Sequence, residues 1–274
     1  MTEFFSTLSG MFAFDFMERA FVMGTLVSVC AALLGVPLVL KRCSMIGDGL
    51  SHVAFGTLAL AMALNMLPLA VTAPVVMIAA FFLLKVADSD LKSGDAAIAM
   101  VSATALAVGI SAVSMSEGFN TDAQNYLFGT ILAMDPASYN AGLVITSAVL
   151  VVYAVLYPRL LAVTFDSAFA KTLGLPVEGL RSTLSVMTAG VIVTGMHLMG
   201  ALLISSLLVF PAMSAMRLTR SYLKVVVAAA LIGAASLWAG LIVSYVWAVP
   251  AGAAIVLANA AAFAIAFLVS LARR

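Results

Sequence analysis

Apolar runs of bilayer length recur along this chain, and they constrain its fold more than any single motif does. One charge-free stretch, from Ser182 to Met216, contains 35 residues without a formal charge. One helix of that length would be about 52 Å long, whereas the hydrocarbon core of a bilayer is about 30 Å thick. The stretch therefore has to turn back, and the glycines and polar residues from 195 to 200 mark the expected turn.

Composition agrees with a membrane protein. Apolar residues make up 64% of the chain and charged residues 9%, and the mean hydropathy is +1.19. Soluble domains carry about 25% charged residues. The apolar runs also lack the alternation that a barrel strand shows. These features predict an all-α polytopic membrane protein. The net charge of +1 gives no reason to expect a nucleic acid as a partner.

Nine spans are expected, near residues 20–40, 46–66, 70–87, 95–115, 140–160, 180–196, 198–217, 224–245 and 251–271. If the N-terminus lies outside, nearly all Lys and Arg fall on one side of the membrane, and Arg19 is the exception. Because basic loops stay in the cytoplasm, this count predicts an outer N-terminus and a cytoplasmic C-terminus. Eight spans remain an alternative. The short apolar segment from Tyr126 to Met134 is expected to form a re-entrant helix.

The longest polar segment between two spans, residues 165 to 181, is expected to hold a short cytoplasmic helix over about 165–175. Asp166 or Ser167 can cap its beginning, and Gly174 and Pro176 can end it. Its apolar side chains fall on one face. Such a helix is well suited to docking a cytoplasmic partner.

Asp48 and His52 place a carboxylate and an imidazole on one helical face at the head of the second span. Ionisable groups inside a span usually mark an ion or substrate path, and one carboxylate with one imidazole suits a transition metal that must be released again. Gly47 and Gly49 permit irregular backbone there, whose carbonyl oxygens could add ligands. Two structural alternatives stay open: Asp48 could cap the span, and His52 could simply bond a neighbouring helix.

His197 is a candidate third ligand, and equally a polar turn residue at the outer surface. If the helices are regular, Asp48 and His52 lie near the inner end of one span and His197 lies near the outer end of another. In that case the three residues cannot hold one ion. His197 would then serve a separate external step.

Four segments resemble, in order, the membrane permeases of ATP-binding-cassette (ABC) importers for zinc and manganese. The segments are Leu40 to His52, with a basic pair followed by Gly-Asp and Ser-His; Tyr126 to Leu132, with Leu-Phe-Gly; Asp166 to Gly174, with Ala170; and Gly200 to Ile204, followed by Pro211 and Ala212. The resemblance implies a single transmembrane permease domain over 1–274. It implies that Asp166, Ala170 and Gly174 belong to a coupling helix seated on an ATPase.

The resemblance also implies a bacterial plasma-membrane assembly of two permease copies, two cytoplasmic ATPase subunits and an extracytoplasmic metal-binding protein. The chain has no phosphate-binding loop of its own, so ATP is expected on the partner subunit, and no enzyme activity or permanently bound cofactor is expected here. The transported ion is expected to be Zn²⁺ or Mn²⁺. Zinc is favoured because Pro250 to Gly252 and Ser51 to Gly56 resemble the zinc members. An ion-coupled secondary metal transporter, or a permease for a siderophore or corrinoid, is the alternative.

Overall fold

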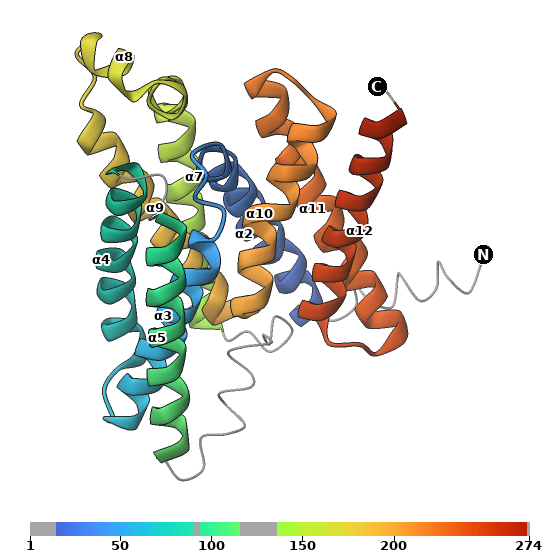
Figure 1. The fold of residues 1–274 in the computed structure, drawn as a ribbon. Helices are drawn as coiled ribbons and strands as arrows, with labels where there is room; N and C mark the ends of the chain where they lie inside the picture. Colours follow the sequence, from blue (N-terminus) through green and yellow to red (C-terminus); the bar gives the residue numbers. More distant parts are fainter. Residues whose placement is uncertain (1–14, 90–93, 116–135, 273–274) are drawn as a thin grey trace, which may run out of the picture.

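The computed structural model describes residues 15–89, 94–115 and 136–272, and the secondary structure in these ranges is helical (Figure 1). The expected re-entrant helix from Tyr126 to Met134 lies outside the described residues. The helices are α2 (Asp15–Leu40), α3 (Ile46–Ala63), α4 (Pro68–Ser89), α5 (Gly94–Met115), α7 (Pro136–Phe165), α8 (Ser167–Thr172), α9 (Val177–Met199), α10 (Ala201–Leu218), α11 (Tyr222–Trp247) and α12 (Ala251–Ala272).

Eight of the described helices are long and apolar enough to cross a bilayer, and α4 adds a shorter apolar stretch, Ala70–Val86. The all-α polytopic class predicted from the sequence is thus confirmed. Each of the nine predicted spans coincides with one helix. Most of these helices extend a few residues beyond the predicted bounds, because polar residues at the ends of an apolar run still continue the backbone hydrogen bonding.

The 35-residue charge-free stretch folds back at one residue. Gly200 separates α9 from α10 and has φ of +96°, a conformation that glycine adopts without the steric cost a Cβ would bring. The predicted turn is therefore confirmed at its C-terminal edge. His197 does not lie in the turn itself but in the last helical turn of α9.

Glycines let the spans pack at backbone distance. A Cβ at Gly35 of α2 would overlap the backbone oxygen of Leu208 in α10, and one at Gly56 of α3 would overlap the backbone oxygen of Ala105 in α5. Small residues serve this purpose in membranes because lipid gives helices no hydrophobic reason to associate. Helix α3 packs against α4, α5, α9 and α10, and most of its residues are buried.

Helix α8 lies at one end of the bundle, at the top of the view in Figure 1. The C-terminal end of α12 lies at the same end. This arrangement fits the sequence-based prediction that the polar segment before α9 and the C-terminus share one side of the membrane.

Candidate functional site: an Asp–His pair on α3

Asp48 and His52 lie on an unbroken helix. α3 begins at Ile46, and its N-cap residue is Met45, which makes no side-chain capping bond. The alternative that Asp48 caps the span is therefore wrong, and so is the expectation of irregular backbone around the two glycines. Ser51 donates its hydroxyl proton to the carbonyl oxygen of Asp48 at 2.8 Å, a bond within the helix.

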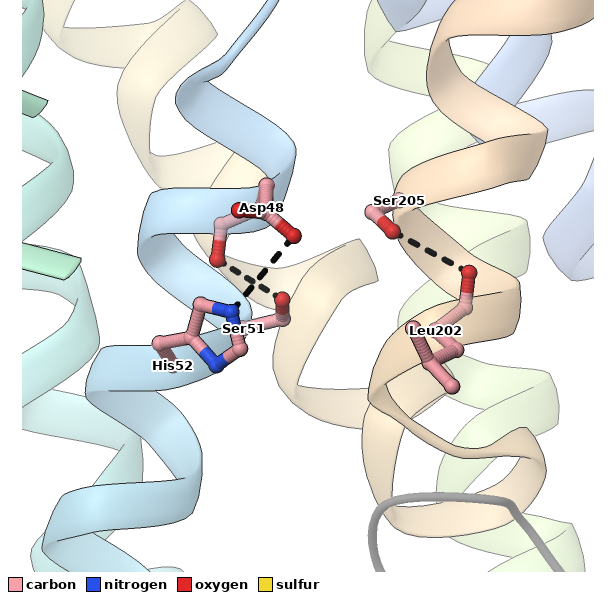
Figure 2. Close-up of polar contacts among 5 residues, drawn as sticks. All are labelled: Asp48, Ser51, His52, Leu202 and Ser205. Atoms are coloured by element: carbon pink, nitrogen blue, oxygen red, sulfur yellow. Dashed lines mark hydrogen bonds and ion pairs between the residues drawn. The ribbon is translucent and has the colours of Figure 1, made fainter. Parts of the chain in front are cut away.

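The two side chains face each other along α3. Asp48 Oδ1 lies 3.6 Å from His52 Nε2, and 39% of the Asp48 side chain and 21% of the His52 side chain are exposed (Figure 2). The second ring nitrogen of His52, Nδ1, is buried without a hydrogen-bond partner among the described residues. A carboxylate and an imidazole that remain partly accessible on an apolar span can still take a ligand.

The flanking glycines explain which way the pair points. A Cβ at Gly47 would lie 2.9 Å from Leu208 Cδ1 of α10, and a Cβ at Gly49 would lie 2.7 Å from Ile98 Cγ2 of α5. Gly47 and Gly49 thus lie on two different sides of α3, where Gly47 packs against α10 and Gly49 packs against α5. Because successive residues turn by about 100° around a helix, Asp48 projects between α10 and α5. His52 falls on the same face.

The pair by itself is an incomplete metal site. No group of three or more His, Cys, Asp or Glu side chains gathers anywhere in the described part of the chain. Zinc is usually held by four ligands, and octahedral oxygen-rich sites suit manganese. Two side chains are therefore fewer ligands than either metal usually takes.

His197 is not part of this pair. It lies at the end of α9, and its Nε2 lies 3.3 Å from the hydroxyl of Ser138 in α7. The structure thus brings together Asp48 and His52, but it does not bring His197 to them. The regular course of α3 is the reason, since no break in that helix carries the pair toward the outer end of α9.

The segment before α9 forms the short helix predicted from the sequence. Asp166 caps α8 and accepts a hydrogen bond from the backbone N–H of Phe169 at 2.9 Å. Ala170 is fully buried against Val163, Val177 and Leu180. Gly174 ends the helix with φ of +76°.

The outer face of α8 is apolar and open. Phe169 is 58% exposed and Leu173 is 60% exposed, and Phe165 at the end of α7 is also exposed. Ala170 instead faces inward and fixes the seat of the helix on the bundle. The exposed apolar group of Phe165, Phe169 and Leu173 is called the α8 face below.

Sequence reasoning missed Ser205 of α10. The residue lies across from Asp48 in Figure 2, and a Cβ at Gly47 would come within 3.7 Å of its Cα. A serine inside an apolar run carries no signal of its own. Only the close approach of α3 and α10 places Ser205 near Asp48.

The structure is a helical membrane bundle. It carries an accessible Asp–His pair on one span and exposes an apolar helix at one end. These features are typical of the membrane subunit of a transporter. The chain belongs to the ABC 3 transport family, whose family model matches residues 13–270. The resemblance seen in the sequence is thereby confirmed. The chain is a permease subunit of an ABC transporter and not an enzyme.

Individual relatives agree over nearly the full length. The chain is 29% identical over 261 residues to the manganese transport system membrane protein MntC of Listeria monocytogenes, covering 95% of this chain and 93% of that protein. It is 29% identical over 253 residues to the high-affinity zinc uptake system membrane protein ZnuB of Haemophilus influenzae, covering 91% and 96%. The solved structure of PsaBC from Streptococcus pneumoniae in complex with Fab matches with a TM-score of 0.83 and 28% identity, covering 96% of this chain and 94% of that chain.

Proposed function

We propose that this protein is the pore subunit of an ATP-driven importer of divalent transition metal ions, and that the ion passes the Asp48–His52 pair. The accessible carboxylate and imidazole on helix α3 are the observation that supports the proposal most strongly. An ionised carboxylate inside a bundle is costly unless a cation compensates it. A passing divalent ion does so transiently. The ABC family match favours ATP as the energy source over the ion-coupled alternative.

A second permease copy would complete the coordination shell. Asp48 and His52 lie on a face between α5 and α10 and leave the ion with two protein ligands. Two copies related by a twofold axis would present two such pairs to one another. The four side chains would equal the number of ligands that zinc usually takes. The homodimer is therefore part of the proposal, and the whole chain serves as one permease domain within it.

ATP hydrolysis is assigned to two cytoplasmic partner subunits that dock on the α8 face. Asp166 caps the first turn of α8, and the buried Ala170 packs α8 against α7 and α9. A force on α8 would therefore be transmitted to these two helices. Closure of the ATPases would push α8 and, through α7 and α9, rock the spans. The metal site would then face the two sides of the membrane alternately.

Delivery is assigned to the opposite end of the bundle. The N-terminus is placed outside and the C-terminus in the cytoplasm of a bacterial plasma membrane, in accordance with the distribution of Lys and Arg. An extracytoplasmic metal-binding protein would dock there. His197, near the α9–α10 turn at Gly200, is positioned for a separate external step.

Alanine replacement of Phe169 and Leu173 together should reduce co-purification of the ATPase by roughly tenfold or more, because buried apolar anchors dominate the affinity of an interface. The control is Leu64→Ala. Leu64 is 61% exposed and follows α3 at the opposite end of the bundle from α8 (Figure 1). An undiminished yield of ATPase with the double variant would contradict the docking role of the α8 face.

Competition uptake with Zn²⁺ and Mn²⁺ in the assembled complex should show that each ion inhibits transport of the other, because aspartate and histidine ligate both. The preference for zinc favoured by the sequence stays a prediction. Among the relatives above, one is named for manganese and one for zinc. Uptake that persists without a nucleotide-hydrolysing partner would contradict the ATP-driven proposal.

A further inference from the structure

Ser205 of α10 lies across from Asp48 of the neighbouring helix α3 (Figure 2). Gly47 allows α10 to approach α3 closely, since a Cβ there would contact Leu208 and come within 3.7 Å of the Cα of Ser205. Asp48 is the next residue along α3. Figure 2 shows the hydroxyl of Ser205 and the carboxylate of Asp48 on the facing sides of the two helices.

The hydroxyl of Ser205 is oriented so that its oxygen can act as a ligand. It donates its proton to the carbonyl oxygen of Leu202, one turn earlier in the same helix, at 3.0 Å. A hydroxyl has one proton and two lone pairs. Because the proton is held within α10, the lone pairs remain available to a cation held between the two helices.

Ser206 provides an internal comparison. It makes the same kind of bond, to the carbonyl oxygen of Leu203 at 2.8 Å, but only 7% of the residue is exposed. Ser205 is half-buried, and its hydroxyl lies on the side of α10 that faces Asp48. Neighbouring serines with equivalent hydrogen bonds thus differ in exposure.

We infer that Ser205 supplies a third ligand, a neutral hydroxyl oxygen, to the ion held by Asp48 and His52, and that it favours Mn²⁺ relative to Zn²⁺. This inference rests on the proposed function. Two copies of the Asp–His pair provide four ligands, which is the usual number for zinc. Two copies of Asp, His and Ser provide six, which is the octahedral number that manganese prefers with oxygen-rich ligands.

The test compares uptake of Mn²⁺ alone and Zn²⁺ alone by the complete complex carrying Ser205→Ala. Manganese uptake should fall on the order of tenfold, which is the lower end of the loss caused by removing a group that supports a metal ligand, because a neutral hydroxyl attracts a cation less strongly than a carboxylate does. Zinc uptake should change much less, so that the ratio of the two rates shifts toward zinc. Ser206→Ala is the control and should leave the ratio unchanged.

Ser205→Cys keeps nearly the same volume and exchanges a hard oxygen for a soft sulfur. It should strengthen binding of Zn²⁺ relative to Mn²⁺ when the purified complex is titrated with each metal. If Ser205→Ala fails to assemble with the ATPase, Ser205→Cys still tests whether residue 205 is a ligand to the metal. Asp48→Ala is measured in parallel.

An unchanged ratio in both Ser205 variants, with Asp48→Ala inactive, would overturn the inference and leave the proposed function intact. Full uptake of both metals by Asp48→Ala would instead remove the proposed function, and the role of Ser205 with it. A shifted ratio together with an inactive Asp48→Ala variant supports both.

Discussion

Asp48→Ala and His52→Ala should each abolish uptake of both metals in the assembled complex. These are the only two His, Cys, Asp or Glu side chains that the described structure pairs on the partly exposed face of α3. Loss of either residue halves that pair, and in a homodimer it removes two of the four carboxylate and imidazole ligands. Loss of a group that merely supports a metal ligand costs about 10- to 100-fold, so loss of the carboxylate or the imidazole itself should exceed about 100-fold.

Two further variants separate chemistry from folding. Asp48→Asn keeps the size of the side chain and removes its charge, and it should be as inactive as Asp48→Ala while assembling normally with the ATPase. Ser51→Ala removes a hydroxyl that bonds only within α3 and should transport at close to the unmodified rate. Uptake is measured with each metal supplied singly. If both alanine variants at Asp48 and His52 transported normally, the pair could not be the metal site.

Gly35→Ala and Gly56→Ala should be the most destabilising single-methyl changes in the bundle. At both positions the added Cβ would overlap a backbone oxygen, Leu208 O and Ala105 O respectively. Backbone cannot rotate away as a flexible side chain can. Overpacking costs about 1–3 kcal/mol when side chains give way, and we expect about 3 kcal/mol or more where a helix has to shift. Thermal unfolding of the detergent-solubilised protein measures the effect.

Gly179→Ala is the matched control for these glycine variants. Gly179 is exposed near the start of α9, and the nearest atom to an added Cβ is Pro176 Cβ at 3.8 Å. Alanine favours a helix over glycine by about 1 kcal/mol, so this variant should be neutral or slightly stabilising. A Gly35→Ala or Gly56→Ala protein that unfolded at the temperature of Gly179→Ala would show that these helices tolerate separation.

The Asp48–His52 pair was predictable because its two residues are four apart on a single helix. Local spacing alone brings such side chains together. The same holds for α8, where Asp166 caps the helix and Gly174 ends it. The role of Ala170 was only partly predictable, because the sequence does not show that its side chain faces the bundle.

The sequence-based prediction of irregular backbone at Gly47 and Gly49 was wrong for a physical reason. A glycine beside a polar residue can mean either a broken helix or a close packing contact, and the sequence is the same in both cases. The structure shows an unbroken α3 whose glycines contact α10 and α5. Asp48 was also open to interpretation as a cap, until the helix was found to begin two residues earlier.

By itself the sequence determined the membrane-spanning helical class, the position of nearly every span, the fold-back before α10 and the residues of the Asp–His pair. These follow from the thickness of the bilayer and from bonding within single helices, both of which are local. The tertiary structure decided which helices pack against α3, that His197 stands apart from the pair, and that Ser205 of α10 stands opposite Asp48. In lipid, two helices pack closely only where small residues let their backbones approach. Which helices become neighbours therefore depends on residues that are far apart in the sequence.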